Sequence, residues 1–223
     1  MIDIYNIYKK LPFFFQFFLF NLKAYLIYRR RFRKHLTKKI YKNILCEDNY
    51  TKSEIIDNTN IKLKKFFINA NQTKFWRDRF KKYNIDFNNL NFIRELEKLP
   101  ILTKQDVKNN YDDIINKSFL SEAIITNTSG TTGSGLKIPI TNFSETYTWL
   151  YWWNYRKKHG IKFNQKCAIL AGLPFFDIDK KKPPYWITNI FTNQLRISIQ
   201  HMNYKTIELI TNKIKKEKIK WIH

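Results

Sequence analysis

Glycine, proline and cysteine are all scarce in this chain of 223 residues, which contains 5, 6 and 2 of them respectively. So few glycines and prolines leave little room for flexible linkers, and a hydrophobic content of 43% excludes a solvated, disordered chain. The two cysteines, Cys46 and Cys167, form no CxxC pair, and Cys167 lies in an apolar run where buried thiols are common. The expected compartment is therefore a reducing cytoplasm.

Acidic residues are also few, 18 against 41 basic ones, which gives a formal net charge of +23. Such an excess suggests nucleic acid, an anionic membrane surface or an anionic ligand as partner. A compositional bias accounts for part of it, because lysine is accompanied throughout by asparagine and isoleucine. The sequence has no zinc-finger spacing, ribonucleoprotein motif or basic-zipper heptad, so nucleic acid is the least favoured partner.

The longest apolar stretch lies near the N-terminus, where residues 11–22 read LPFFFQFFLFNL and residues 29–33 form an arginine cluster. Gln16 and Asn21 interrupt it, so the run is shorter than the roughly 20 residues needed to span a bilayer. Without a small-residue cleavage site it does not resemble a secretory signal. Residues 1–48 are predicted to form an aromatic and basic helical segment.

Two interpretations of that segment stay open. An interfacial helix with an aromatic face and a basic end fits an anionic leaflet, which would make the protein peripheral at the inner membrane face. A helix that is apolar nearly all round also fits burial against the rest of its own domain.

The rest of the chain predicts a mixed α/β fold. Helices are expected from Ser53 to Lys98, after Thr103 as N-cap with Asp106 as its partner, and from Ser144 to Lys158. Towards the C-terminus, the apolar runs Cys167–Leu173, Leu195–Ile199 and Ile219–Ile222 have strand length, and Asn203 is expected to cap a helix between the last two. Strand, helix, strand in that order favours a partly parallel sheet.

Residues 126–141, reading TNTSGTTGSGLKIPIT, contain three of the five glycines. The apolar residues on either side predict strand, loop, strand, with Pro139 marking the second strand as an edge. Glycine allows backbone N–H groups to turn toward an anion, hydroxyl side chains add donors, and Lys137 supplies a mobile charge. The spacing matches neither a Walker A loop nor a dinucleotide-binding fingerprint. An ordinary Gly/Thr hairpin is the structural alternative.

The same loop resembles the ATP-gripping signature of the adenylate-forming (AMP-binding, acyl-CoA synthetase-like) superfamily. The residues that carry this resemblance, and that it would assign to ATP, are Thr128, Ser129, Gly130, Thr131, Thr132, Gly133 and Lys137. One departure is the spacer before Lys137, which is one residue longer than the commonest form. FWRDRFKKYNID at 75–86 and LPILTKQDV at 99–107 are similar to phenylacetate–coenzyme A ligase relatives. PPYWITN at 183–189 and QLRISIQHM at 194–202 resemble their CapK-like branch, found with capsular polysaccharide genes.

This resemblance implies a ligase that activates a carboxylate with ATP and Mg²⁺, forms an acyl-adenylate, and passes the acyl group to coenzyme A or another nucleophile. It implies that residues 49–223 form an incomplete ATP-binding large domain, with the C-terminal small domain absent and the chain inactive by itself. His201 falls within the matching segment and is a candidate substrate-side residue. No catalytic residue is identified, and no metal cluster of the chain's own is expected because the four histidines are scattered. The alternative function is a basic protein that binds a membrane surface or nucleic acid without catalysis.

Overall fold

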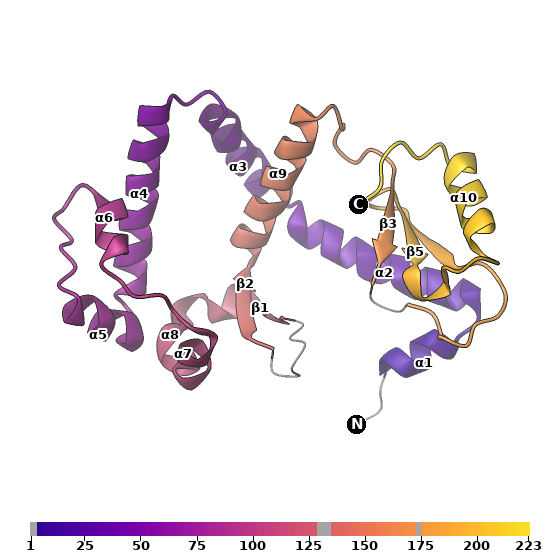
Figure 1. Ribbon diagram of the computed structural model, residues 1–223, viewed down its shortest axis with the longest axis horizontal. Helices are drawn as coiled ribbons and strands as arrows, with labels where there is room; N and C mark the ends of the chain where they lie inside the picture. The colour runs from indigo at the N-terminus through magenta and orange to yellow at the C-terminus, as the bar shows by residue number, and fades with distance from the viewer. Residues whose placement is uncertain (1–3, 129–134, 173–174) are drawn as a thin grey trace. The chain divides into compact units, whose positions relative to one another are not determined.

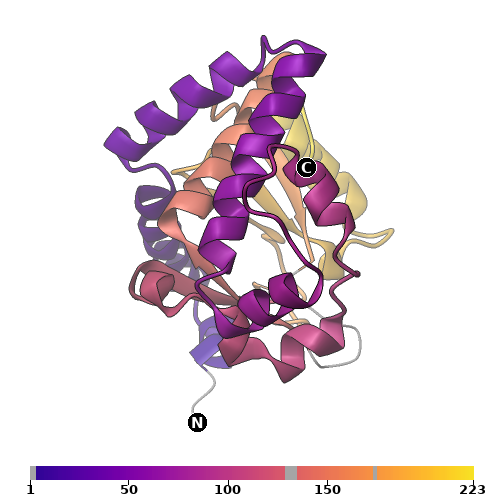
Figure 2. The ribbon, with the colours of Figure 1, turned by 90° about the vertical axis from the view of Figure 1, so that its left-hand side faces the viewer.

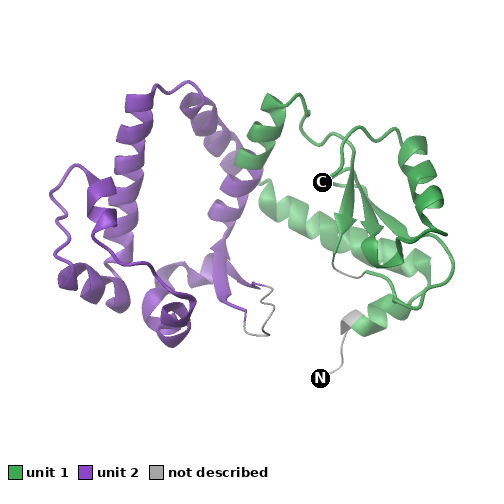
Figure 3. Cartoon of the chain, in the orientation of Figure 1, with its two compact units in different colours: residues 1–33, 151–223 green, residues 34–150 purple. Residues whose placement is uncertain are grey.

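The computed structural model describes residues 4–128, 135–172 and 175–223 (Figure 1). They form a mixed α/β fold, which confirms the predicted class. The chain divides into two compact units, one made of residues 1–33 and 151–223 and the other of residues 34–150 (Figure 3). This division does not follow the predicted boundary after residue 48, since the N-terminal segment contributes to both units.

The unit of residues 34–150 is mainly helical. Its elements are α3 (Lys34–Glu47), α4 (Lys52–Ala70), α5 (Lys74–Lys82), α6 (Phe92–Glu97), α7 (Lys104–Asn109), α8 (Tyr111–Ile114), the 3₁₀ helix η1 (Lys117–Glu122), β1 (Ala123–Asn127), β2 (Lys137–Thr141) and the first half of α9 (Asn142–Lys158). Thr103 caps α7 as predicted: its hydroxyl accepts from the Asp106 amide at 3.1 Å, and its own amide donates to the Asp106 carboxylate at 2.9 Å.

Aromatic rings form the core of this unit. Phe67 of α4, Phe80 of α5 and Phe92 of α6 are all buried, and the rings of Phe67 and Phe80 stack with centroids 4.9 Å apart. Trp76 packs against the same cluster. The predicted aromatic spacing on α5 therefore marks a helix that packs against α4, whose length runs up the picture in Figure 2.

The other unit is built on a small sheet. Its elements are α1 (Ile4–Lys10), α2 (Phe13–Arg31), the second half of α9, β3 (Cys167–Ala171), β4 (Trp186–Asn189), β5 (Gln194–Ser198), the 3₁₀ helix η2 (Ile199–His201) and α10 (Ile207–Lys216). The strand order is β3-β5-β4. β3 and β5 are parallel, in agreement with the predicted partly parallel sheet, and β4 pairs antiparallel with β5. Ile222 makes a further parallel bridge to Ala168, so the last apolar run extends the sheet.

Each face of this sheet is covered by a different helix. Ala168, Leu195 and Ile197 pack with Ile210 of α10 on one face. On the other face, Ile187 and Ala171 lie in a cluster with Phe17 and Phe20 of α2. Burial against its own domain is therefore correct for one side of the N-terminal helix.

The expected cap of α10 is wrong. The helix begins at Ile207 with Thr206 as its N-cap, and no side chain caps it. Asn203 forms a tight turn instead, in which its side-chain oxygen accepts from the Lys205 amide at 2.9 Å. Asparagine favours both arrangements, because its side chain can bond to a backbone amide two residues on.

Candidate phosphate-binding hairpin

The glycine-rich loop joins two strands of an antiparallel hairpin. Alanine 123 lies opposite Thr141 and Asn127 opposite Lys137, so the strand, loop, strand prediction is confirmed. Pro139 lies opposite Ile125 in this two-stranded sheet, where each strand has one unpaired edge. The missing N–H of proline is therefore compatible with its strand, as expected.

A pair of hydrogen bonds closes the hairpin where the loop begins and ends. The Thr128 amide donates to the Leu136 carbonyl at 2.9 Å, and the Leu136 amide donates to the Thr128 hydroxyl at 2.8 Å. Thr126 adds a third link from its hydroxyl to the Ile138 carbonyl at 3.0 Å. Because Thr128 Oγ1 accepts the Leu136 N–H, its own hydrogen stays available to donate to a ligand.

Gly135 allows this closure because the backbone of Thr128 passes very near it. A Cβ atom at position 135 would overlap the Thr128 carbonyl oxygen and lie 3.2 Å from its carbonyl carbon. The need for glycine here is thus explained by a close approach of two backbone segments.

Lys137 is exposed and begins β2 directly opposite Asn127, next to the closing pair. In the described parts of the chain no ion pair involves its ammonium group. Thr128 and Lys137 therefore both lie at the base of the loop, on opposite strands, and the alternation of side chains along a strand places Lys137 on the same face as Asn127. The other predicted ATP contacts, Ser129, Gly130, Thr131, Thr132 and Gly133, lie outside the described residues.

These features suit a phosphate group. A hydroxyl donor and a cation that has no carboxylate partner among the described residues flank one end of a loop whose closure excludes a side chain at Gly135. Within the ranges that the structure describes, no three His, Cys, Asp or Glu side chains come together as metal ligands.

His201 lies in the other unit and is 5% exposed. Its Nε2 is 3.0 Å from the carbonyl oxygen of Asp177, and its Nδ1 is 2.8 Å from the Ser198 hydroxyl. A carbonyl can only accept, so Nε2 carries the proton and, in the neutral ring, Nδ1 accepts from Ser198. The ring also stacks on Tyr185, with centroids 5.1 Å apart.

This arrangement bears on the predicted substrate-side role of His201. Both ring nitrogens already bond to the chain itself, and together they tie the segment around Asp177 to the end of β5. A direct hydrogen bond to substrate would require one of these contacts to break. The role stays a prediction, and the geometry favours positioning of the neighbouring segment.

Arg156 of α9 is an unforeseen feature. It is 7% exposed, and its guanidinium carbon lies 4.8 Å from the ring centroid of Trp153 and 5.1 Å from that of Trp221. Burial lowers the pKa of Arg156, and the two rings offset part of the lost hydration. The spacing of Trp152, Trp153 and Arg156 on one helix could have indicated this cluster from the sequence. Trp221 is distant in the sequence and reaches Arg156 only in the folded chain.

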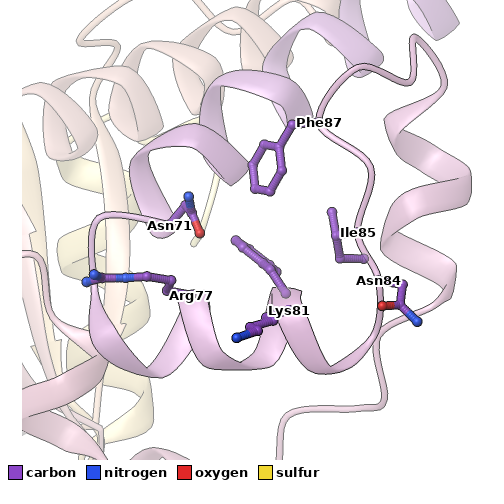
Figure 4. Close-up of a pocket in the computed structure, with 7 residues that line it drawn as sticks. Asn71, Arg77, Lys81, Asn84, Ile85 and Phe87 are labelled. Atoms are coloured by element: carbon purple, nitrogen blue, oxygen red, sulfur yellow. The ribbon is translucent and has the colours of Figure 1, made fainter.

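A shallow pocket of about 300 Å³ lies in the helical unit (Figure 4). Arg77 and Lys81 of α5 stand on one side of it, and Ile85 and Phe87 face them. Phe80, Ile85 and Phe87 also belong to the aromatic core of this unit, so the pocket is a depression in the surface of that core. None of the predicted site residues lines it.

Comparison with known proteins gives one informative match. No protein-family model matches the chain. A curated protein, Protein CapK of Staphylococcus aureus, is 25% identical over 212 residues, which cover 94% of this chain and 45% of CapK. The chain thus spans less than half the length of that relative, and over nearly all of its own length it is similar to Protein CapK.

Proposed function

We propose that this chain forms the N-terminal, phosphate-gripping part of an ATP-dependent carboxylate-activating ligase of the adenylate-forming type, with a role in capsular or surface polysaccharide biosynthesis. The observation that carries the proposal is the closed β1–β2 hairpin with Thr128 and Lys137 at the base of its loop. Similarity to Protein CapK along 94% of the chain supports it.

In this proposal the hairpin holds the β- and γ-phosphates of ATP. Lys137 neutralises part of the phosphate charge, and the Thr128 hydroxyl donates a hydrogen bond while its backbone keeps the loop closed. ATP bound with Mg²⁺ would supply the electrophilic α-phosphorus. A carboxylate oxygen of the substrate would attack it, the bond to the oxygen that bridges the α- and β-phosphates would break, and the products would be the acyl-adenylate and pyrophosphate. The hairpin's contribution is positioning and charge stabilisation, and it makes no covalent bond to the substrate.

Measurement of triphosphate binding tests the proposal without requiring turnover. Titration calorimetry of this chain with ATP and Mg²⁺, and separately with inorganic tripolyphosphate, would be carried out for the parent and for Lys137→Gln. Loss of one charge-assisted contact costs about 1.5–3 kcal/mol, so affinity is expected to fall about tenfold to a hundredfold.

Lys104→Gln is the matched control, because Lys104 is also exposed and lies in the same unit. Its affinity for tripolyphosphate is expected to equal that of the parent. If both variants weaken binding equally, the anion is attracted only by net charge. If Lys137→Gln binds as well as the parent, the hairpin is structural and the proposal fails.

A further inference from the structure

Helix α2 buries polar side chains and exposes large apolar ones, unlike an ordinary surface helix. Its two uncharged polar side chains, Gln16 and Asn21, are 3% and 6% exposed, whereas Phe14 and Phe18 are 73% and 59% exposed. A surface helix of a water-soluble protein normally turns its apolar side inward. The outward side of α2 is therefore not adapted to water.

The side of α2 that faces the sheet makes hydrogen bonds and apolar contacts within its own unit. Gln16 donates to the carbonyl of Lys9 at 2.8 Å, which fixes α1 to the start of α2. Asn21 donates to the Thr188 carbonyl at 3.0 Å and accepts from the Ile190 amide at the same distance. With Phe17 and Phe20 packed on the sheet, this side of α2 cannot turn outward without unfolding its unit.

The outward side forms one continuous surface, here called the outer face of α2. At 100° per residue its members fall within an arc of roughly 140°. All are more than a third exposed: Phe14, Phe15, Phe18, Leu19, Leu22, Tyr25 and Leu26. Scattered apolar residues on a surface are normal, but a contiguous aromatic and aliphatic strip of this kind marks an interaction site.

The charges on the segment that carries the outer face are all positive. No acidic residue occurs between Ile4 and Cys46. Lys10 precedes the helix, and Arg29 and Arg33 lie at its C-terminal end, all three exposed. A cationic rim around an apolar centre complements a surface that is anionic outside and hydrocarbon within.

We propose that the outer face of α2 lies in the interface of an anionic lipid bilayer, with the helix parallel to the membrane plane and the sheet on its other side. No helix in the described residues is long and apolar enough to cross a membrane. Phenylalanine and leucine side chains enter the boundary between headgroups and acyl chains, and Lys10, Arg29 and Arg33 bind lipid phosphates. Association with a second copy is disfavoured, because two chains of net charge +23 repel one another.

The test is co-sedimentation of the full chain with sucrose-loaded vesicles, made either of phosphatidylcholine alone or of an equal mixture with phosphatidylglycerol. The parent is expected to bind the mixed vesicles at least about tenfold more strongly than the neutral ones. The triple variant Phe14→Ser/Phe18→Ser/Leu22→Ser is expected to lose at least about tenfold in partition onto the mixed vesicles.

A second triple variant, Ile55→Ser/Ile56→Ser/Ile61→Ser, removes three exposed apolar residues from α4 and serves as the control. Its vesicle binding is expected to equal that of the parent. Circular dichroism melting checks that the outer-face variant keeps its fold, which is expected because the three residues point away from the sheet.

Three results would overturn the proposal. The outer-face variant could bind the mixed vesicles like the parent, or both triple variants could lose binding equally. The parent could also fail to bind vesicles and instead form a dimer in sedimentation velocity that the outer-face substitutions dissociate. That result would assign the surface to a second copy of the chain.

Discussion

At the scale of single residues, burial decides which reactive groups are available. Burial raises the pKa of the Cys167 thiol to about 11, even though Arg156 and Arg196 lower it in part. A raised pKa leaves the sulfur protonated, and a protonated thiol is a poor nucleophile. The expectation that Cys167 is a buried thiol is confirmed.

The burial of Cys167 and the exposure of Cys46 predict that a thiol reagent labels the two cysteines selectively. Relative to a thiol at the ordinary value of 9.0, Cys167 has about a hundredfold less thiolate at mildly alkaline pH. Iodoacetamide is therefore expected to modify exposed Cys46 in the folded chain and to modify Cys167 only after denaturation. Peptide mass spectrometry reads out both sites.

Cys46→Ser provides the control, since the folded variant is expected to take up almost no label. Equal labelling rates at positions 46 and 167 in the folded parent would contradict the buried position of Cys167. Reaction at both sites in urea shows that neither thiol is blocked by another modification.

At the scale of elements, the β1–β2 hairpin depends on the space beside Gly135. Gly135→Ala is expected to push the Thr128 carbonyl away and weaken the two closing hydrogen bonds. At about 0.5–1.5 kcal/mol for each bond, the local stability of the hairpin should fall by about 1–3 kcal/mol. Faster amide hydrogen exchange at Thr128 and Leu136, measured by NMR, would show this.

Gly172→Ala is the matched substitution, because a Cβ at Gly172 meets no atom within 4 Å. It is expected to leave exchange at the hairpin unchanged. Unaltered exchange at Leu136 in Gly135→Ala would mean that the hairpin closes differently, and the placement of Thr128 and Lys137 at the base of the loop would then lose its support.

At the scale of the whole molecule, one unit is assembled from both ends of the chain. Asn21 links α2 to β4 across a sequence separation of 167, through the bond to the Thr188 carbonyl. Such a contact closes a long loop, and the entropic cost of closure rises only slowly with loop length. Helix α2 is therefore an integral part of this unit, and its other side forms the outer face of α2.

Asn21→Leu tests this role. The substitution leaves the Thr188 carbonyl and the Ile190 amide without their side-chain partner in partly buried hydrogen bonds. An unpaired buried group costs about 1–3 kcal/mol, and partial exposure places each of these two groups near the lower end. The free energy of unfolding is expected to fall by at least about 2 kcal/mol, with faster hydrogen exchange in β4 and β5. Urea denaturation and NMR-detected exchange would measure the two effects.

Asn69→Leu, an exposed substitution on α4, is expected to change stability by less than about 0.5 kcal/mol. If the two variants unfold at the same urea concentration, Asn21 is dispensable. The attachment of α2 to the sheet would then rest on aromatic contacts such as those of Phe17 and Phe20.

The sequence determined the elements whose causes are local. The hairpin follows from two apolar runs joined by a short glycine-rich loop, the start of α7 from Thr103 and Asp106 three residues apart, and the helical character of α2 from its composition. A partly parallel sheet followed from the order strand, helix, strand, but the sequence did not indicate that β3 and β5 pair. The candidate phosphate contacts were likewise chosen from the sequence, and phosphate binding by each of them stays a prediction.

The tertiary structure decided what depends on distant residues. β4 is four residues long and pairs only because β5 offers its edge, so no periodic pattern predicted it. Arg156 is enclosed by aromatic rings because Trp221 arrives from another part of the chain. An apolar pattern nearly all round α2 did not indicate which side is buried; the hydrogen bonds of Asn21 to β4 fixed that choice and left its phenylalanines facing outward.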